Sequence, residues 1–303
     1  MTRPAKIALQ VGLSAALITA VLWQADLDRV ADALAGISPR WFLLSLLATG
    51  FATLVMVERW RVLLVARGRR QPGFGWLCET YLIALLLGQV LPTAVGGDAV
   101  RAIDLARRTG DTAEAWSTVL VDRLVGLAAL GVLAVVGVAA GGGGVGRGIA
   151  TLVLAGVLGG SALAAWLLLS HTARPLVARL PLRSLTAAIH AYRAHHLALA
   201  WVFVLGIVAQ SARVLSIAAL AHGMSLPLSV WSLFVLCPVL FLVTIVPVSL
   251  NGIGLREATF VVVLAGVGVT REDAFALGLA FFAVGVLVAS LGGIALLRRA
   301  LGG

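Results

Sequence analysis

Long apolar runs alternate with short charged segments along most of this chain. No charged side chain occurs within residues 7–23, 41–57, 124–146, 148–170 and 274–297. A helix needs about 20 apolar residues to cross ~30 Å of hydrocarbon, so each run is long enough, or nearly so, to span a membrane. The full pattern predicts spans at about 7–23, 41–57, 116–140, 148–170, 198–220 and 275–297.

Two other apolar segments, at 76–106 and 231–269, are interrupted by helix breakers. These breakers are Pro92, Gly96 and Gly97 in the first segment, and Pro238, Pro247, Gly252 and Gly254 in the second. Broken backbone at membrane depth is tolerated only where it packs in protein or lines a polar cavity. We therefore predict two re-entrant or broken hairpins. The expected fold class is an all-α integral membrane protein, a polytopic helical bundle with about six full spans and about eight membrane segments.

The two halves of the chain resemble each other. A constant offset aligns Ala66–Arg101 with Ala221–Arg256 without a gap, and it matches prolines, glycines and tryptophans. We predict repeats over 1–145 and 146–303, each ordered span, span, hairpin, span and entering the membrane from opposite sides. An inverted repeat is typical of transporters in which the halves rock about a site at their interface. A duplication that serves only as a scaffold is the alternative.

Composition supports the same class. Hydrophobic residues make up 61% of the 303 residues, and charged residues only 12%, about half the share of a soluble domain. The net charge of +10 would suggest nucleic acid on a soluble protein. Here it follows the positive-inside rule, so no nucleic acid is expected. Basic residues at 1–6, 58–75, 171–197 and 298–299 place both termini and two loops in the cytoplasm.

Polar residues at the two breaks are the first candidates for chemistry. Gly97, Asp98 and Arg101 follow Pro92, and two glycines at a helix start leave amides that favour an anion. We expect Asp98 to cap this helix. In the second hairpin the corresponding residues are Gly252, Gly254, Arg256 and Glu257. Each group predicts either a phosphate site or a capped helix with a local ion pair.

Three ionisable residues fall within or beside predicted spans: Asp122, Arg123 and Arg213. Such residues are costly in a bilayer and usually face a polar interior. Adjacent residues point in different directions, so Asp122 and Arg123 should each pair elsewhere. Arg123 can alternatively snorkel to the interface. The sequence holds no metal-ligand spacing, nucleotide fingerprint or catalytic motif that we can identify, so we expect no metal, cofactor or catalytic residue.

The motifs Pro92…Arg101, Asp122-Arg123 with Gly126, and Pro247…Glu257 together resemble the flippase-like family. That family includes the transmembrane region of lysylphosphatidylglycerol synthase. The resemblance implies lipid translocases, or accessory proteins for lipid-linked head groups. It implies these functional residues: Gly97, Asp98, Arg101, Arg123, Gly252, Gly254, Arg256 and Glu257.

These observations predict a transporter rather than an enzyme. The expected function is a translocase for a phospholipid or polyprenyl-linked lipid with an anionic head group, in a bacterial or archaeal cytoplasmic membrane. One alternative is a membrane-embedded transferase that uses Asp98 or Glu257 as base. The other is a non-catalytic partner that docks a cytoplasmic lipid-modifying enzyme through residues 171–197.

Overall fold

The computed structural model describes residues 26–68, 72–91, 96–140, 191–245 and 254–301, and within these the regular structure is helical. Four helices are long and apolar enough to cross a membrane: α3 (Pro39–Ala66), α6 (Thr112–Ala139), α10 (His196–Gly223) and α13 (Arg271–Leu301). They confirm the expected class, a polytopic helical membrane protein. The predicted spans at 7–23 and 148–170 lie outside the described residues.

Helix α3 is longer than the predicted span at 41–57. It continues to Ala66, so Arg59 and Arg61 lie within the helix rather than in a basic loop at 58–75. The prediction was wrong because it treated every charge as a mark of a loop. Arg59 is only 4% exposed and is paired with Asp122 on α6. An arginine whose charge is neutralised inside the bundle can lie within a membrane-spanning helix, so the helix does not have to end before it.

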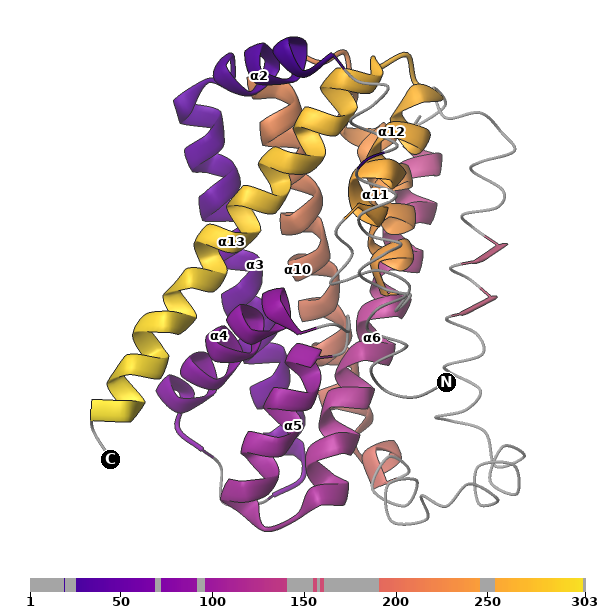
Figure 1. The fold of residues 1–303 in the computed structure, drawn as a ribbon. Helices are drawn as coiled ribbons and strands as arrows, with labels where there is room; N and C mark the ends of the chain where they lie inside the picture. Colours follow the sequence, from indigo (N-terminus) through magenta and orange to yellow (C-terminus); the bar gives the residue numbers. More distant parts are fainter. Residues whose placement is uncertain are drawn as a thin grey trace, which may run out of the picture.

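Side chains cap the starts of two long helices, and one short helix was not predicted. Asp111 accepts the Glu114 N–H at the start of α6, and Thr270 accepts the Asp273 N–H at the start of α13. The unpredicted helix is α2 (Leu27–Ala35), which lies between the predicted spans at 7–23 and 41–57. Asp26 caps α2 by accepting the N–H groups of residues 28 and 29. In Figure 1, α2 lies across one end of the bundle.

Two helical hairpins lie between the long helices. The first joins α4 (Phe74–Val90) to α5 (Gly96–Thr109), and the second joins α11 (Val230–Ile245) to α12 (Leu255–Ala265). At 1.5 Å per residue these four helices are about 16 to 26 Å long, too short to cross ~30 Å of hydrocarbon. Pro238 lies inside α11 and does not end it, in contrast to its predicted role as an interruption.

The arms of the first hairpin are antiparallel and close. Thr80 on α4 donates a 3.0 Å hydrogen bond to Asp104 on α5. Nearer the turn, a Cβ on Gly97 would lie 2.6 Å from the Ala84 carbonyl oxygen. Only glycine permits this approach of two backbones. The predicted residue Gly97 therefore has a packing role at the turn.

The hairpins enter the bundle from opposite ends. Arg67, just after α3, binds Glu114 at the start of α6 through two hydrogen bonds of 2.8 and 2.9 Å. The chain between them thus leaves and returns at one end. At the other end of α3, the Ser38 N–H donates to the Gly223 carbonyl at the end of α10, and Phe275 of α13 packs beside α2. In Figure 1, α4 and α5 lie in the lower half of the molecule, and α11 and α12 lie in the upper half.

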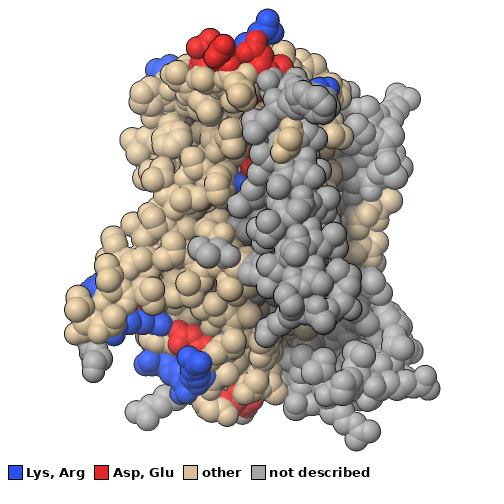
Figure 2. Space-filling model, in the orientation of Figure 1, with Lys and Arg blue, Asp and Glu red and all other residues tan. Residues whose placement is uncertain are grey.

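Charged side chains gather at the two ends of the molecule. Figure 2 shows acidic residues at the α2 end and a mixed, arginine-rich patch at the opposite end, with a largely uncharged belt between them on this face. Many large apolar side chains on the long helices are exposed, including Leu47, Phe51 and Ile294. An exposed apolar belt between two charged ends is the surface that a bilayer requires.

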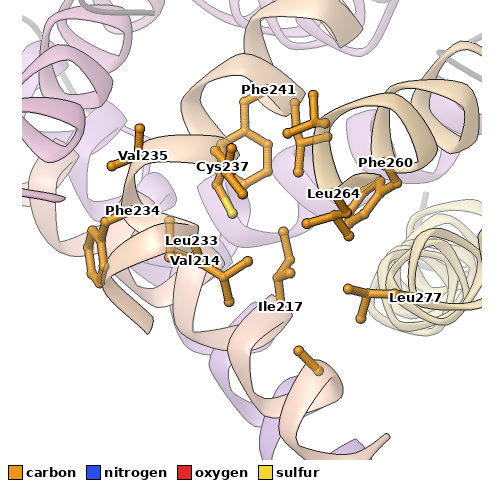
Figure 3. Close-up of a cluster of buried hydrophobic side chains, with 14 of the residues drawn as sticks. Val214, Ile217, Leu233, Phe234, Val235, Cys237, Phe241, Phe260, Leu264 and Leu277 are labelled. Atoms are coloured by element: carbon orange, nitrogen blue, oxygen red, sulfur yellow. The ribbon is translucent and has the colours of Figure 1, made fainter. Parts of the chain in front are cut away.

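The largest core cluster lies in the second half and joins it to α6. It contains Val214 and Ile217 of α10, Phe234 of α11 and Leu264 of α12. Figure 3 shows these side chains meeting Leu277 of α13. Leu130 and Leu133 of α6 belong to the same cluster. The second hairpin is thus packed against a helix from the first half.

Helix α13 makes the reciprocal connection, crossing from the second hairpin to the first. Gly292 lies so close to α4 that an added Cβ would stand 2.2 Å from the Leu82 carbonyl oxygen. At the end of α13, Arg299 binds Asp104 at 2.7 Å and Glu79 at 3.3 Å. The two halves are therefore interlocked, which does not favour their rocking as separate rigid bodies.

This crossing gives a stability prediction. Gly292→Ala should force α13 away from α4 and lower the free energy of unfolding by about 1–3 kcal/mol, the usual cost of overpacking. Thermal unfolding in detergent measures the change. Gly293→Ala is the matched control, because its Cβ would lie 3.8 Å from Leu86 Cδ2, an ordinary contact. Equal melting temperatures for the two variants would contradict the close crossing.

Candidate binding site

A cavity of about 370 Å³ lies in the middle of the bundle, where the hairpins approach each other. Its wall takes residues from both hairpins and from all four long helices, so it joins the two halves. It includes Gly97 near the first turn and Arg256 at the start of α12. Broken helices around a central polar cavity are the arrangement in which many transporters bind their substrates.

One wall of the cavity is a chain of alternating charges. Arg59 of α3 binds Asp122 of α6 at 2.6 Å, and Asp122 also meets Arg101 of α5 at 3.4 Å. Arg101 binds Asp98 at 2.6 Å, and Asp98 also accepts a hydrogen bond from Arg123. Each carboxylate is therefore shared by two arginines. The network fixes three helices around the site.

The predicted pairing of Asp122 and Arg123 with different partners is seen in this network. Asp98 does not act as the helix cap that we expected. It lies in the first turn of α5, and its carboxylate accepts from the arginines. Two charged donors form stronger hydrogen bonds with a carboxylate than backbone amides do, which explains the difference.

Arg101 is held on all sides. It is 3% exposed, and its guanidinium lies 4.6 Å from the ring centroid of Tyr81 and 5.2 Å from that of Trp60. Two carboxylates and two aromatic rings therefore surround a side chain that we predicted to bind substrate. This geometry gives Arg101 a structural role in the cavity wall, because its charge is already paired.

In the second hairpin, the predicted residues form a helix start. Gly254 has φ +79°, a conformation that favours glycine, and its N–H donates to Glu257 at 2.7 Å. Glu257 also binds Arg256 at 2.6 Å, and the guanidinium of Arg256 lies 4.4 Å from the Phe282 ring centroid. The fourth predicted residue, Gly252, lies outside the described residues. Here too a local ion pair is present beside the cavity.

Arg213 differs from the other arginines of the cavity. It lies near the middle of α10, where its guanidinium donates to Gln210 at 3.2 Å and lies 3.9 Å from the Phe241 ring centroid. In the described part of the chain it contacts no carboxylate. The segments outside that part contain no Asp or Glu, so they cannot supply one. A cation in a low-dielectric interior needs an anionic partner to offset its desolvation.

The cavity has an excess of positive charge. Among the described residues, five arginines line it, and three carboxylates, those of Asp98, Asp122 and Glu257, are close enough to pair with them. Two arginine atoms, Arg59 Nη1 and Arg101 Nη1, are buried without a hydrogen-bond partner in the described structure. The excess charge and these unused donors suit an anion.

Sequence reasoning missed Arg59, although a signal for it existed. Asp122, just inside a predicted span, requires a cation, and Arg59 follows the apolar run at 41–57 closely. Two glycines leave room for its guanidinium. A Cβ on Gly126 would lie 3.2 Å from Arg59 Nη1, and one on Gly206 would lie 3.4 Å from it. Such space between α6 and α10 is not visible from one sequence.

The fold and the site together define a class: a multi-pass helical membrane protein with a central, arginine-rich cavity between two interlocked halves. A profile of the family described as "Lysylphosphatidylglycerol synthase TM region" matches residues 7–293. The chain belongs to this family. The match confirms the resemblance noted from the motifs. No curated protein sequence matches the chain.

Proposed function

We propose that the protein is a translocase that moves an amphiphile with an anionic head group across the cytoplasmic membrane of a bacterium or archaeon. The lipid would be a phospholipid or a polyprenyl-linked lipid, and both termini of the protein would lie in the cytoplasm. The observation that carries the proposal is Arg213, a cation at the central cavity that contacts no carboxylate among the described residues. A phosphate group supplies the missing negative charge.

The head group would enter the cavity while the acyl chains stay in the surrounding lipid. The hairpins enter from opposite ends of the bundle and both line the cavity, so movement of one hairpin at a time would expose the head group to one side. Because α13 packs on α4 and α6 packs on α11, we place the motion in the hairpins rather than in rocking of whole halves. Alternating exposure of a fixed site is the general requirement for transport.

Two features favour transport over the transferase alternative. The carboxylates that a transferase would use as base, Asp98 and Glu257, are both bound by arginines. In addition, the cavity is mainly lined by arginine, phenylalanine and small residues, which suits binding of a lipid phosphate. We therefore propose a transporter and not an enzyme. The segment at 171–197, proposed to dock a partner enzyme, lies mostly outside the described residues.

Reconstitution tests this function directly. Purified protein is placed in vesicles with a fluorescent phosphatidylglycerol in both leaflets, and a membrane-impermeant reductant bleaches the outer label. Vesicles without protein should lose about half of the signal, whereas vesicles with active protein should lose nearly all of it. Fluorescent phosphatidylcholine in parallel vesicles reports general leakiness. Bleaching that stops at half for phosphatidylglycerol would contradict the proposal.

A further inference from the structure

Three helices meet around one tryptophan at the arginine-rich end of the bundle. The ring centroid of Trp76, near the start of α4, lies 4.8 Å from the guanidinium of Arg108 and 5.2 Å from that of Arg299. Arg108 comes from the end of α5, and Arg299 comes from the end of α13. We call these three residues the Trp76 cluster. None of them lines the central cavity, so the proposed translocase function gives the cluster no role.

The two arginines of the Trp76 cluster differ in their partners. Arg299 binds two carboxylates, that of Asp104 at 2.7 Å and that of Glu79 at 3.3 Å. Arg108 is exposed and pairs with no carboxylate among the described residues. The segments outside those residues contain no Asp or Glu, so they cannot supply one. The charge of Arg108 is therefore available to an anion from outside the chain.

Trp76 offers a second donor beside Arg108. Its carbonyl oxygen accepts from Arg299 at 3.2 Å, but its indole N–H donates to no acceptor in the described part of the chain. Tryptophan is enriched where a membrane meets water, because its ring is apolar and its N–H is polar. A guanidinium and an indole N–H are both donors to phosphate oxygens. The pair thus presents two donors where lipid head groups lie.

Exposed apolar side chains are next to the Trp76 cluster in the sequence. Leu297 and Leu301 are each two residues from Arg299 at the end of α13, and both are exposed. Phe74, also exposed, is two residues before Trp76 at the start of α4. Figure 2 shows the basic side chains of this end at the edge of the uncharged belt. A free phosphate ion has no use for apolar surface, whereas a phospholipid brings acyl chains that cover it.

We propose that the Trp76 cluster is a second lipid site, which binds the phosphate of an anionic phospholipid that is not transported. Arg108 and the indole N–H of Trp76 donate to the phosphate, and the acyl chains lie along α4 and α13. The anionic head group also offsets the repulsion between Arg108 and Arg299, two like charges held near one ring. Binding therefore stabilises the packing of α13 on the first hairpin. This inference does not require the cavity to bind or move lipid.

Thermal unfolding with defined lipids tests the site. Protein stripped of lipid in a neutral detergent is supplemented with phosphatidylglycerol, or with phosphatidylcholine of identical acyl chains. A ligand that binds only the folded state raises the melting temperature by mass action. Phosphatidylglycerol should therefore raise it by at least about 2 °C more than phosphatidylcholine does. Equal melting temperatures with the two lipids would overturn the inference.

A pair of neighbouring variants separates the site from a diffuse positive surface. Arg108→Gln should remove at least about half of the rise that is specific to phosphatidylglycerol, because it removes the charged donor beside Trp76. Arg107→Gln is the matched control, since Arg107 is also exposed at the end of α5 but makes no contact with the Trp76 ring. This control should keep the full rise. Equal losses in the two variants would show that net charge alone attracts the lipid, and would contradict the site.

Two further measurements locate the lipid that causes the rise. Arg213→Gln alters the central cavity and should keep the rise. A rise lost in Arg213→Gln but kept in Arg108→Gln would place the lipid in the cavity and overturn the inference. Glycerol 3-phosphate has the phosphate without acyl chains and should give no rise. An equal rise with it would identify a site for soluble phosphates instead of a lipid.

The vesicle assay keeps this test distinct from that of the proposed function. If the vesicles show no lipid movement but the rise specific to phosphatidylglycerol is present and depends on Arg108, the translocase is contradicted and the second lipid site is supported. If lipid moves but Arg108→Gln keeps the full rise, the translocase is supported and the second site is contradicted.

Discussion

Replacing Arg213 by glutamine is expected to slow lipid movement strongly while leaving the protein folded. Arg213 contacts no carboxylate in the described structure, so its removal leaves no acidic side chain without a partner. Glutamine keeps a polar head at the cavity but cannot neutralise a phosphate. The expected loss is about tenfold to hundredfold in the rate of phosphatidylglycerol movement, corresponding to one charge-assisted hydrogen bond.

The control for this change is Arg61→Gln. Arg61 lies on α3 within the same bundle, but it pairs with Glu58 at 2.7 Å, and its side chain is 41% exposed. It has the same chemistry as Arg213 without facing the cavity, so lipid movement should stay near that of the native protein. If Arg213→Gln moves lipid as fast as Arg61→Gln, the central cavity does not bind the head group.

Asp122→Asn is expected to cause the largest loss of stability. Asp122 is 2% exposed and neutralises both Arg59 and Arg101. Asparagine removes that charge and leaves two buried guanidinium groups with less compensation. Breaking a buried ion pair from one side costs about 3–5 kcal/mol, so the melting temperature in detergent should fall by many degrees or the protein should fail to fold.

Glu58→Gln is the matched control for this substitution. It breaks the partly exposed pair with Arg61 on α3. Exposed pairs contribute only about 0–1 kcal/mol. The double variant Arg59→Met with Asp122→Leu should recover part of the stability lost in Asp122→Asn, because no charge then remains at Arg59. A melting temperature for Asp122→Asn equal to that of Glu58→Gln would show that the network does not hold α3, α5 and α6 together.

Much of the fold could be predicted because the bilayer imposes strict rules on sequence. Apolar runs marked the four long helices now seen, and the prolines and glycines marked the two hairpin segments. The predicted end of α3 was wrong because a buried ion pair offsets the cost of placing a charged residue within a span. Helix α2 was missed because an amphipathic helix at the membrane end has no long apolar run.

The candidate site was predicted only in part. Asp98, Arg101, Arg123, Arg213 and Arg256 all line the central cavity, although they come from four different helices. The role of each residue depends on which oppositely charged side chain it pairs with, and these pairs form between different helices. From spacing alone, Arg101 and Arg213 look alike, yet Arg101 has two acidic partners, whereas Arg213 contacts Gln210 and Phe241 and has no carboxylate partner among the described residues. The repeat itself stays a prediction.

The contact of α13 with α4 has a consequence for how the chain assembles as it is synthesised. The first hairpin is made long before α13, yet Leu82 packs against Gly292, and Glu79 and Asp104 bind Arg299. During translation the first hairpin therefore lacks the arginine partner of these acidic side chains until the last helix inserts. An insertase or chaperone that shields an unfinished hairpin would speed this step. A premature stop before α13 would leave the first hairpin exposed to membrane quality-control proteases.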